Sequence, residues 1–181
     1  MSRLFNLTTV ASGAALGLII TGVIAFVGGT YARDVVHDQL TPQKIFFPAD
    51  ASELPANLKQ YAGEQVDTGA EARAFADDYI GLHLKGIGKG RSYSEVSGEF
   101  MKDPSNEQLA QQRQSLFMGE SLRGVLLNAW GWGTVGRLAT IAGVVLFVLG
   151  VILLAIPLLA ASSARRTARA GAPAGERAAT A

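Results

Sequence analysis

The chain has 181 residues, a formal net charge of +1 and no cysteine. Near-neutral charge argues against a nucleic-acid partner, since such proteins usually carry a concentrated basic face. The lack of cysteine excludes disulfides, iron–sulfur clusters and thiol chemistry, and the length suits one modest domain plus membrane segments.

The N-terminal region predicts a short polar head, residues 1–9, followed by a transmembrane helix over residues 10–31. No charge occurs between Leu4 and Ala32, and a bilayer core takes about 20 apolar helical residues to cross. A cleaved signal peptide is the alternative, with a poor cleavage site at residues 30–32. The apolar run is longer than a typical signal core, which favours an uncleaved helix.

Residues 32–135 predict a small extracytoplasmic helical domain. A helix is expected to run out of the first span to Leu40 and to stop at Thr41-Pro42. The Phe46-Phe47 pair that follows is either a plug for the domain core or a contact to membrane or partner. A short helix is expected over residues 54–62.

Two capping boxes predict helix starts within this domain. Thr68 with Glu71, and Ser92 with Glu95, have the spacing of a capping box. In this motif the side chain of each residue accepts a hydrogen bond from the free backbone amide of the other. The first helix ends in the glycine-rich residues 86–90 and the second near Lys102. A last helix from about Asn106 continues into the second span. No segment alternates with a two-residue period, so the predicted fold class is all-α.

A second transmembrane helix is predicted over residues 136–161, because no charge occurs from Leu138 to Ala164. Pro157 near its inner end is expected to kink it. Residues 162–181 are rich in Ala, Arg, Gly and Pro, and they predict a disordered basic cytoplasmic tail.

Charges near the span ends predict the orientation. Arg165, Arg166 and Arg169 follow the second span, whereas residues 30–136 have an acidic excess. Lys and Arg mark the cytoplasmic side, so both termini are expected inside the cell membrane and residues 32–135 outside it. Three aromatic residues fall at the predicted outer boundary, where amphipathic rings favour the headgroup level: Tyr31, Trp130 and Trp132.

Small residues recur every seven positions in both spans, which suits a close antiparallel helix pair. The predicted helix-packing residues are Gly22, Gly29, Gly136, Gly143 and Gly150. Gly13 and Gly17 add a GxxxG spacing that could instead pair two copies of the chain. Frequent glycine in membrane helices is the structural alternative.

Candidate chemistry is sparse. The two histidines, His37 and His83, with nearby aspartates could form a facial iron site only if separate helices brought three ligands together. The glycine-rich, basic residues 86–91 follow a helix and lack the Gly-Lys-Ser/Thr ending of a phosphate loop. The apolar stretches of the two spans contain no charged residue, which disfavours transport by this chain alone. We therefore predict no catalytic, metal or cofactor-binding residue.

Four segments carry a resemblance: VVHDQLTPQKIFFP, QYAGEQVDTGAEARAFADDYI, SYSEVS, and SLFMGESLRGVLLNAWGWG before the last span. They resemble a group of actinobacterial two-span membrane proteins, over nearly the whole chain except the tail. Members are often described as a subunit of an aromatic ring-opening dioxygenase. The resemblance implies a two-span membrane fold and transfers no catalytic residue.

These observations predict a non-enzymatic membrane protein that acts by interaction, as an accessory or scaffold subunit of an envelope or membrane complex. Its expected partners are the lipid bilayer and a membrane protein or a second copy of itself. A ring-opening dioxygenase subunit and a membrane sensor are the alternatives.

Overall fold

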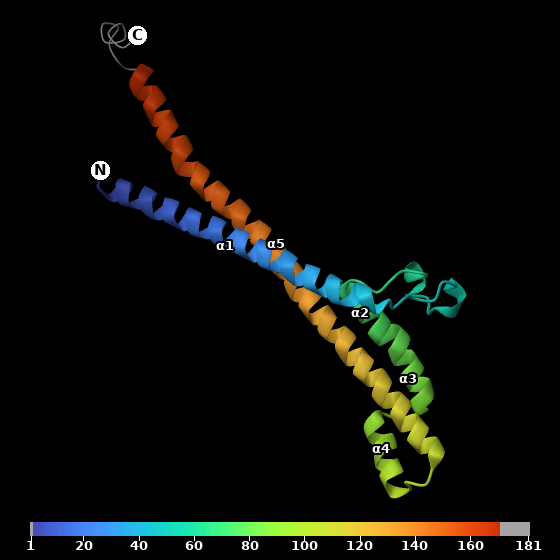
Figure 1. The fold of residues 1–181 in the computed structure, drawn as a ribbon. Coiled ribbons are helices and arrows are strands. Elements are labelled where there is room, and N and C mark those ends of the chain that lie inside the picture. The colour runs from blue at the N-terminus through green and yellow to red at the C-terminus, as the bar shows by residue number, and fades with distance from the viewer. Residues whose placement is uncertain (1, 171–181) are drawn as a thin grey trace. The chain divides into compact units, whose positions relative to one another are not determined.

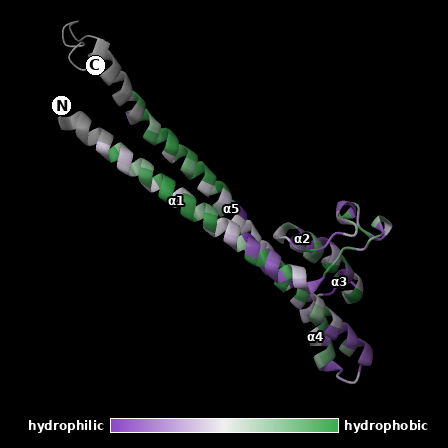
Figure 2. Cartoon of the chain, turned by 45° about the horizontal axis from the view of Figure 1, so that its top comes forward, coloured by the Kyte–Doolittle hydropathy of each residue, from purple (hydrophilic) through white to green (hydrophobic). Residues whose placement is uncertain are grey.

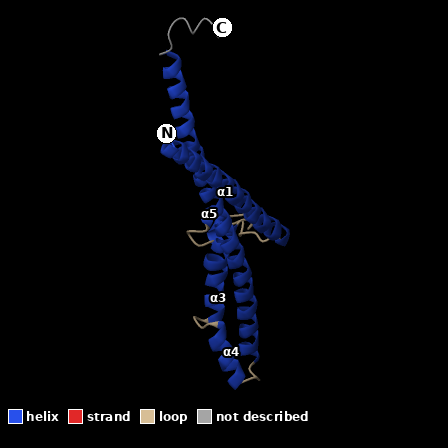
Figure 3. Cartoon of the chain, turned by 90° about the vertical axis from the view of Figure 1, so that its left-hand side faces the viewer, coloured by secondary structure: helices blue, strands red, loops and turns tan. Residues whose placement is uncertain are grey.

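The computed structural model describes the backbone of residues 2–170 and the side chains of residues 9–157 and 159 (Figure 1). Helices and loops make up this part of the chain, and no strand occurs in it (Figure 3). The nearest approach to a sheet is one isolated bridge between Phe46 and Gln65. The all-α prediction is confirmed for the described residues.

Two long helices dominate the chain: α1 (Ser2–Leu40) and α5 (Glu107–Ala170). Each contains a stretch long and apolar enough to cross a membrane. In Figure 2 these stretches are green, toward the two ends of the chain. Only 11% of each apolar stretch is buried within the chain, so these helices differ from the core helices of a soluble protein.

The chain divides into two compact units. The terminal unit contains residues 1–28 and 139–181, and the central unit contains residues 29–138. The central unit holds the loops and the short helices, and each unit is described by itself below.

The short helices of the central unit begin where the capping boxes predict. Thr68 caps α2 (Gly69–Ala74) and Ser92 caps α4 (Tyr93–Lys102), and in both boxes the reciprocal hydrogen bonds with Glu71 and Glu95 are present. Between them the chain continues from α2 through the π-helix η4 (Phe75–Ile80) into α3 (Gly81–Gly88). Lys89, in the left-handed region with φ 52°, ends this run, as predicted for residues 86–90.

The helix predicted over residues 54–62 is wrong. The chain there forms only the 3-10 turn η3 (Lys59–Tyr61), after η2 (Ala51–Glu53). Leu54 has extended backbone angles, which the ring of Pro55 favours in the preceding residue. Consecutive turns, with Leu58 N bonded to Pro55 O and Tyr61 N to Leu58 O, replace a continuous helix.

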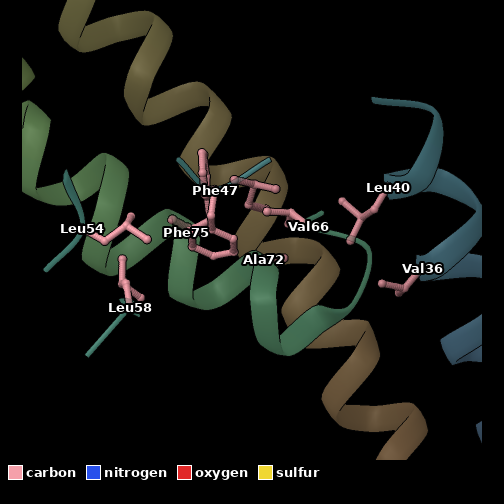
Figure 4. Packing of buried hydrophobic residues seen from close by; sticks show 10 residues of the cluster. Val36, Leu40, Phe47, Leu54, Leu58, Val66, Ala72 and Phe75 are labelled. Atoms are coloured by element: carbon pink, nitrogen blue, oxygen red, sulfur yellow. The ribbon is translucent and has the colours of Figure 1, made fainter. Parts of the chain in front are cut away.

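Phe47 lies at the centre of the core of the central unit (Figure 4). It is 2% exposed, stacks on Tyr61 and meets Phe75 edge-on, whereas its neighbour Phe46 is 52% exposed. The core-plug alternative therefore holds for Phe47 alone. The cluster draws on α1, α2, η4, α5 and the loops between α1 and α2, and its buried members are Val36, Leu40, Phe47, Leu54, Leu58, Val66, Ala72, Phe75, Ala76 and Leu126.

Helix α1 continues past its apolar stretch to Leu40 and is followed by the 3-10 turn η1 (Thr41–Gln43), as predicted. The disorder predicted from Ser162 is wrong for residues 162–170, because α5 extends to Ala170. Alanine and arginine are both strong helix formers, and they outnumber the other residues there. The rest of the predicted tail, 171–181, lies outside the described residues. Pro157 lies inside α5.

Candidate functional site

Glycines allow close helix contact within the terminal unit. A Cβ atom on Gly22 would lie 2.6 Å from the Phe147 nitrogen, and one on Gly143 would lie 2.5 Å from the Phe26 nitrogen. A Cβ on Gly150 would approach Ala15 O and Ile19 N at 2.9 Å. The backbones of α1 and α5 therefore touch at these positions, and no larger residue fits without separating the helices.

Gly13 and Gly17 are different, because nothing lies within 4 Å of a Cβ built on either of them. The chain itself does not bring them into a helix contact. Pairing of two copies through this GxxxG spacing stays a prediction.

In the central unit a second pair of glycines brings α1 and α5 together. A Cβ on Gly136 would lie 2.7 Å from Gly29 O and 2.9 Å from Cγ of Arg33. A third pair joins α2 to α5, since a Cβ on Gly133 would lie 3.1 Å from Cα of Gly69. Three helices thus converge through glycine contacts.

The predicted boundary aromatics have different surroundings. Tyr31 and Trp132 are 69% and 59% exposed. Trp130 is half-buried, and the guanidinium of Arg73 lies 4.6 Å from its ring centre. Arg165, Arg166 and Arg169 belong to α5, and their side chains lie outside the described ones.

A cavity of about 420 Å³, open to solvent, lies where α1, α2 and α5 converge within the central unit. This volume lies in the range of small-molecule sites, about 300–1,000 Å³. Five of its side chains carry or can carry charge, and the complete lining is Arg33, Asp34, Val36, His37, Asp67, Thr68, Gly69, Ala70, Trp130, Gly133, Thr134 and Arg137. We call it the charged cavity.

One contact between a histidine and a carboxylate lies inside the charged cavity. His37 Nδ1 lies 3.7 Å from Asp67 Oδ2, and Thr41 Oγ1 lies 3.5 Å from His37 Nε2. Burial raises the pKa of Asp67 above its ordinary value, and the negative charge of Glu71 raises it further, whereas His37 acts in the opposite direction. The other three charged groups, Arg33, Asp34 and Arg137, make no ion pair or hydrogen bond within the described residues.

His83 lies elsewhere, on α3. Its Nδ1 lies 2.8 Å from Tyr79 O and its ring packs on the Tyr79 ring. The structure does not place the two histidines in one ligand set. Among the described residues, no three His, Cys, Asp or Glu side chains lie close enough to hold a metal ion.

The π-helix η4 is held by Arg123 of α5. Ala76 O accepts the wide-turn bond from Gly81 N and also a bond of 3.0 Å from Arg123 Nε. Arg123 Nη2 donates to Asp77 at 3.1 Å. π-Turns often mark functional positions, but these bonds join the two elements and expose no free group, so this one has a structural role.

A row of exposed apolar side chains follows one face of α5 in the central unit. Met118, Val125 and Trp132 recur every seven residues and are 58%, 60% and 59% exposed, whereas Leu116 and Leu126 of the same helix are buried. Leu122, 39% exposed, lies beside them. We call Met118, Leu122, Val125 and Trp132 the outer stripe of α5. Exposed apolar side chains grouped on one helix face are a feature of interaction sites.

Sequence reasoning found the histidines but missed the charged cavity. No site was predicted at Arg33 or Arg137. A usable signal was present: each is the charged residue nearest the outer end of its span, so an antiparallel pair brings them to one level. Asp67 carried no such signal, because its position depends on the path of the loop before α2.

No family model, curated protein or solved structure matches this chain. Its function is therefore argued from the residues and contacts described above.

Proposed function

We propose that this chain is an integral membrane protein that acts by interaction, as an accessory or scaffold subunit of an envelope or membrane complex. The terminal unit spans the cell membrane twice, both termini are cytoplasmic, and the central unit lies outside. The outer stripe of α5 carries this proposal, because it provides an apolar contact surface on the unit that lies beyond the lipid.

The terminal unit supports the membrane part. Its apolar side chains point away from the chain, with Ile24 67% and Ile156 60% exposed. Water around such a surface is costly, and lipid removes that cost. A signal sequence, the usual alternative for an apolar N-terminal helix, does not account for α5, whose apolar stretch lies far along the chain.

Helix geometry places Met118, Leu122 and Val125 of the outer stripe beyond the bilayer, whereas Trp132 lies at its headgroup level. If Trp130 marks the headgroup level, Val125 and Met118 lie about 8 and 18 Å beyond it along α5, at 1.5 Å per residue. Lipid tails do not reach Met118 at that height. A seven-residue apolar repeat is the pattern by which one helix packs along another, so a helix of a partner subunit is the expected occupant.

Substitution of the stripe tests the interaction. Membranes are solubilised in a mild detergent, and the tagged full-length chain is analysed by native electrophoresis. We expect the wild-type chain in a discrete species larger than the free chain. Met118→Arg with Val125→Arg should release it, because two guanidiniums cannot be buried unpaired in an apolar contact.

Asn57→Arg is the matched control, because it places the same charge at an exposed position outside α5. It should leave the large species intact. A wild-type chain that migrates as the free chain, or a large species that persists in the double variant, contradicts the proposal.

The enzyme alternative makes a different prediction. A ring-opening dioxygenase subunit with an iron site would purify with stoichiometric iron that is lost on His37→Ala or His83→Ala. That result would replace the present proposal. The sensor alternative requires an output through the C-terminal residues, and a phenotype that survives deletion of residues 165–181 would count against it.

A further inference from the structure

None of the residues of the outer stripe lines the charged cavity, so the proposed subunit contact does not explain the cavity. Two guanidiniums, of Arg33 and Arg137, and the carboxylate of Asp34 face one concave site without pairing with each other. Asp67 adds a second carboxylate, whose partner is the imidazole of His37. Opposite charges that share a cavity but remain separate suit a ligand that itself carries both charges.

The lining indicates which charges the ligand carries. Guanidinium groups hold phosphate through charge-assisted, often bidentate hydrogen bonds. Carboxylates accept hydrogen bonds from a primary ammonium group. The two arginines and the two aspartates together carry no net charge, so a ligand with one phosphate and one ammonium leaves that sum at zero.

We propose that the charged cavity binds the phosphoethanolamine headgroup of a phospholipid in the outer leaflet. The phosphate lies between Arg33 and Arg137, and the ammonium group lies against Asp34 and Asp67. This inference rests on the proposed membrane topology and adds a lipid ligand to it.

The position of the cavity favours a lipid over a free solute. Arg33 follows Tyr31 by two residues, Arg137 follows Trp132 by five, and Trp130 lines the cavity itself. Tyr and Trp rings prefer the headgroup level, so the cavity lies at the height of lipid phosphates. Basic pockets between membrane helices bind anionic lipid headgroups on the cytoplasmic side, and the same guanidinium–phosphate chemistry applies to a phosphate of the outer leaflet.

The two carboxylates also select among headgroups. Phosphatidylglycerol offers a phosphate but no ammonium, and would leave both aspartates facing an anion. Phosphatidylcholine has the right charges, but its quaternary nitrogen has no N–H to donate to a carboxylate. Only the ethanolamine headgroup of these three satisfies both halves of the site.

Native mass spectrometry of the full chain tests the assignment. The protein is reconstituted in nanodiscs that contain equal amounts of phosphatidylethanolamine, phosphatidylcholine and phosphatidylglycerol, and is then released in the spectrometer. We expect one retained phosphatidylethanolamine, at least about tenfold over either other lipid, which corresponds to about 1.4 kcal/mol.

Two sets of variants test the two halves. Arg33→Gln with Arg137→Gln should abolish retention. Asp34→Asn should keep a bound lipid but reduce the preference for ethanolamine over glycerol at least about fivefold. Arg113→Gln is the matched control, since its guanidinium lies over the Phe100 ring, outside the cavity, and it should behave as the wild type. Circular dichroism confirms that each variant is folded.

Soluble glycerophosphoethanolamine distinguishes the two sources of the same headgroup. Its failure to displace the lipid at millimolar concentration supports the lipid assignment, whereas equal binding of the free compound overturns it. Equal retention of all three lipids also overturns the inference, because the arginines then hold any phosphate.

The experiment distinguishes failure of the headgroup site from failure of the proposed function. A chain that inserts into nanodiscs but retains no lipid refutes the headgroup site and leaves the membrane topology intact. A chain that does not insert refutes the topology first.

Discussion

Asp67 links the stability of the central unit to pH. Its pKa is raised, first by burial and then by the charge of Glu71. The folded state therefore holds this proton more tightly than the unfolded chain does. Protonated Asp67 therefore contributes to the stability of the folded state. This contribution is complete at pH values below the unfolded pKa, near 3.8, and is lost as the pH rises through the higher pKa of the folded state.

Replacement of Asp67 by asparagine should therefore stabilise the chain at neutral pH. We expect Asp67→Asn to raise the thermal midpoint at pH 7 and to lose this advantage near pH 4. The gain should stay below about 1 kcal/mol, because a third of the side chain is exposed and water screens its charge. The measurement is thermal unfolding of the detergent-solubilised chain at both pH values.

Asp78→Asn is the control, because it removes an exposed carboxylate with no ion pair or hydrogen bond in the described part of the chain. It should follow the wild type at both pH values. If Asp67→Asn instead lowers the midpoint at pH 7, the pair with His37 outweighs burial.

Residues whose role depends on near neighbours were predictable from the sequence. The capping boxes at Thr68 and Ser92 are local, since each joins groups three residues apart, and both are present. Arg33 and Asp67 meet in one cavity only because loops and three helices bring them there. No local pattern encodes that approach, so the candidate site could not be read from the sequence.

Among the helices too, features set by local sequence were predictable, and features set by distant residues were not. The ends of α1 and α4 follow from proline and capping signals, and they lie where expected. The π-helix η4 was not predicted, because its wide turn depends on Arg123, which lies 47 residues from Ala76 in the chain. The path of residues 54–62 was mispredicted because Pro55 was taken as the first turn of a helix, whereas it follows an extended Leu54 and the chain continues in separate turns.

Close contact between α1 and α5 in the terminal unit requires glycine at a few positions, because a Cβ atom there would clash with the facing helix. Gly143→Ala places a methyl group 2.5 Å from the Phe26 nitrogen and 2.6 Å from Gly22 O, so α1 and α5 must separate. We expect a loss of about 1–3 kcal/mol, the usual cost of overpacking. Unfolding in mixed micelles of increasing dodecyl sulfate content, followed by circular dichroism, measures it.

Gly13→Ala is the same chemical change at a position with nothing within 4 Å. It should leave stability unchanged or raise it slightly, because alanine is the better helix former. Equal destabilisation by the two substitutions would show that helix contact is not what Gly143 provides.

The whole molecule combines two surfaces with different solvent requirements. The terminal unit exposes aliphatic side chains on both helices. The central unit has an apolar core and contains many hydrophilic residues (Figure 2). A bilayer satisfies the first surface and water the second. The arginines after Ala164 favour the cytoplasm, and the proposed topology therefore has the central unit on the opposite side.

The absence of cysteine makes this topology testable with single introduced thiols. Met101→Cys, at a side chain 72% exposed on α4, should react fully with a membrane-impermeant maleimide in intact cells. Ala181→Cys should react only after lysis, because the C-terminus is expected inside. The wild-type chain has no thiol and provides the background. The intact mass of the purified chain decides in the same experiment whether residues 1–31 are retained, as an uncleaved first span requires. Labelling of Ala181→Cys in intact cells, with Met101→Cys protected, would reverse the orientation and remove the charged cavity from the outer leaflet.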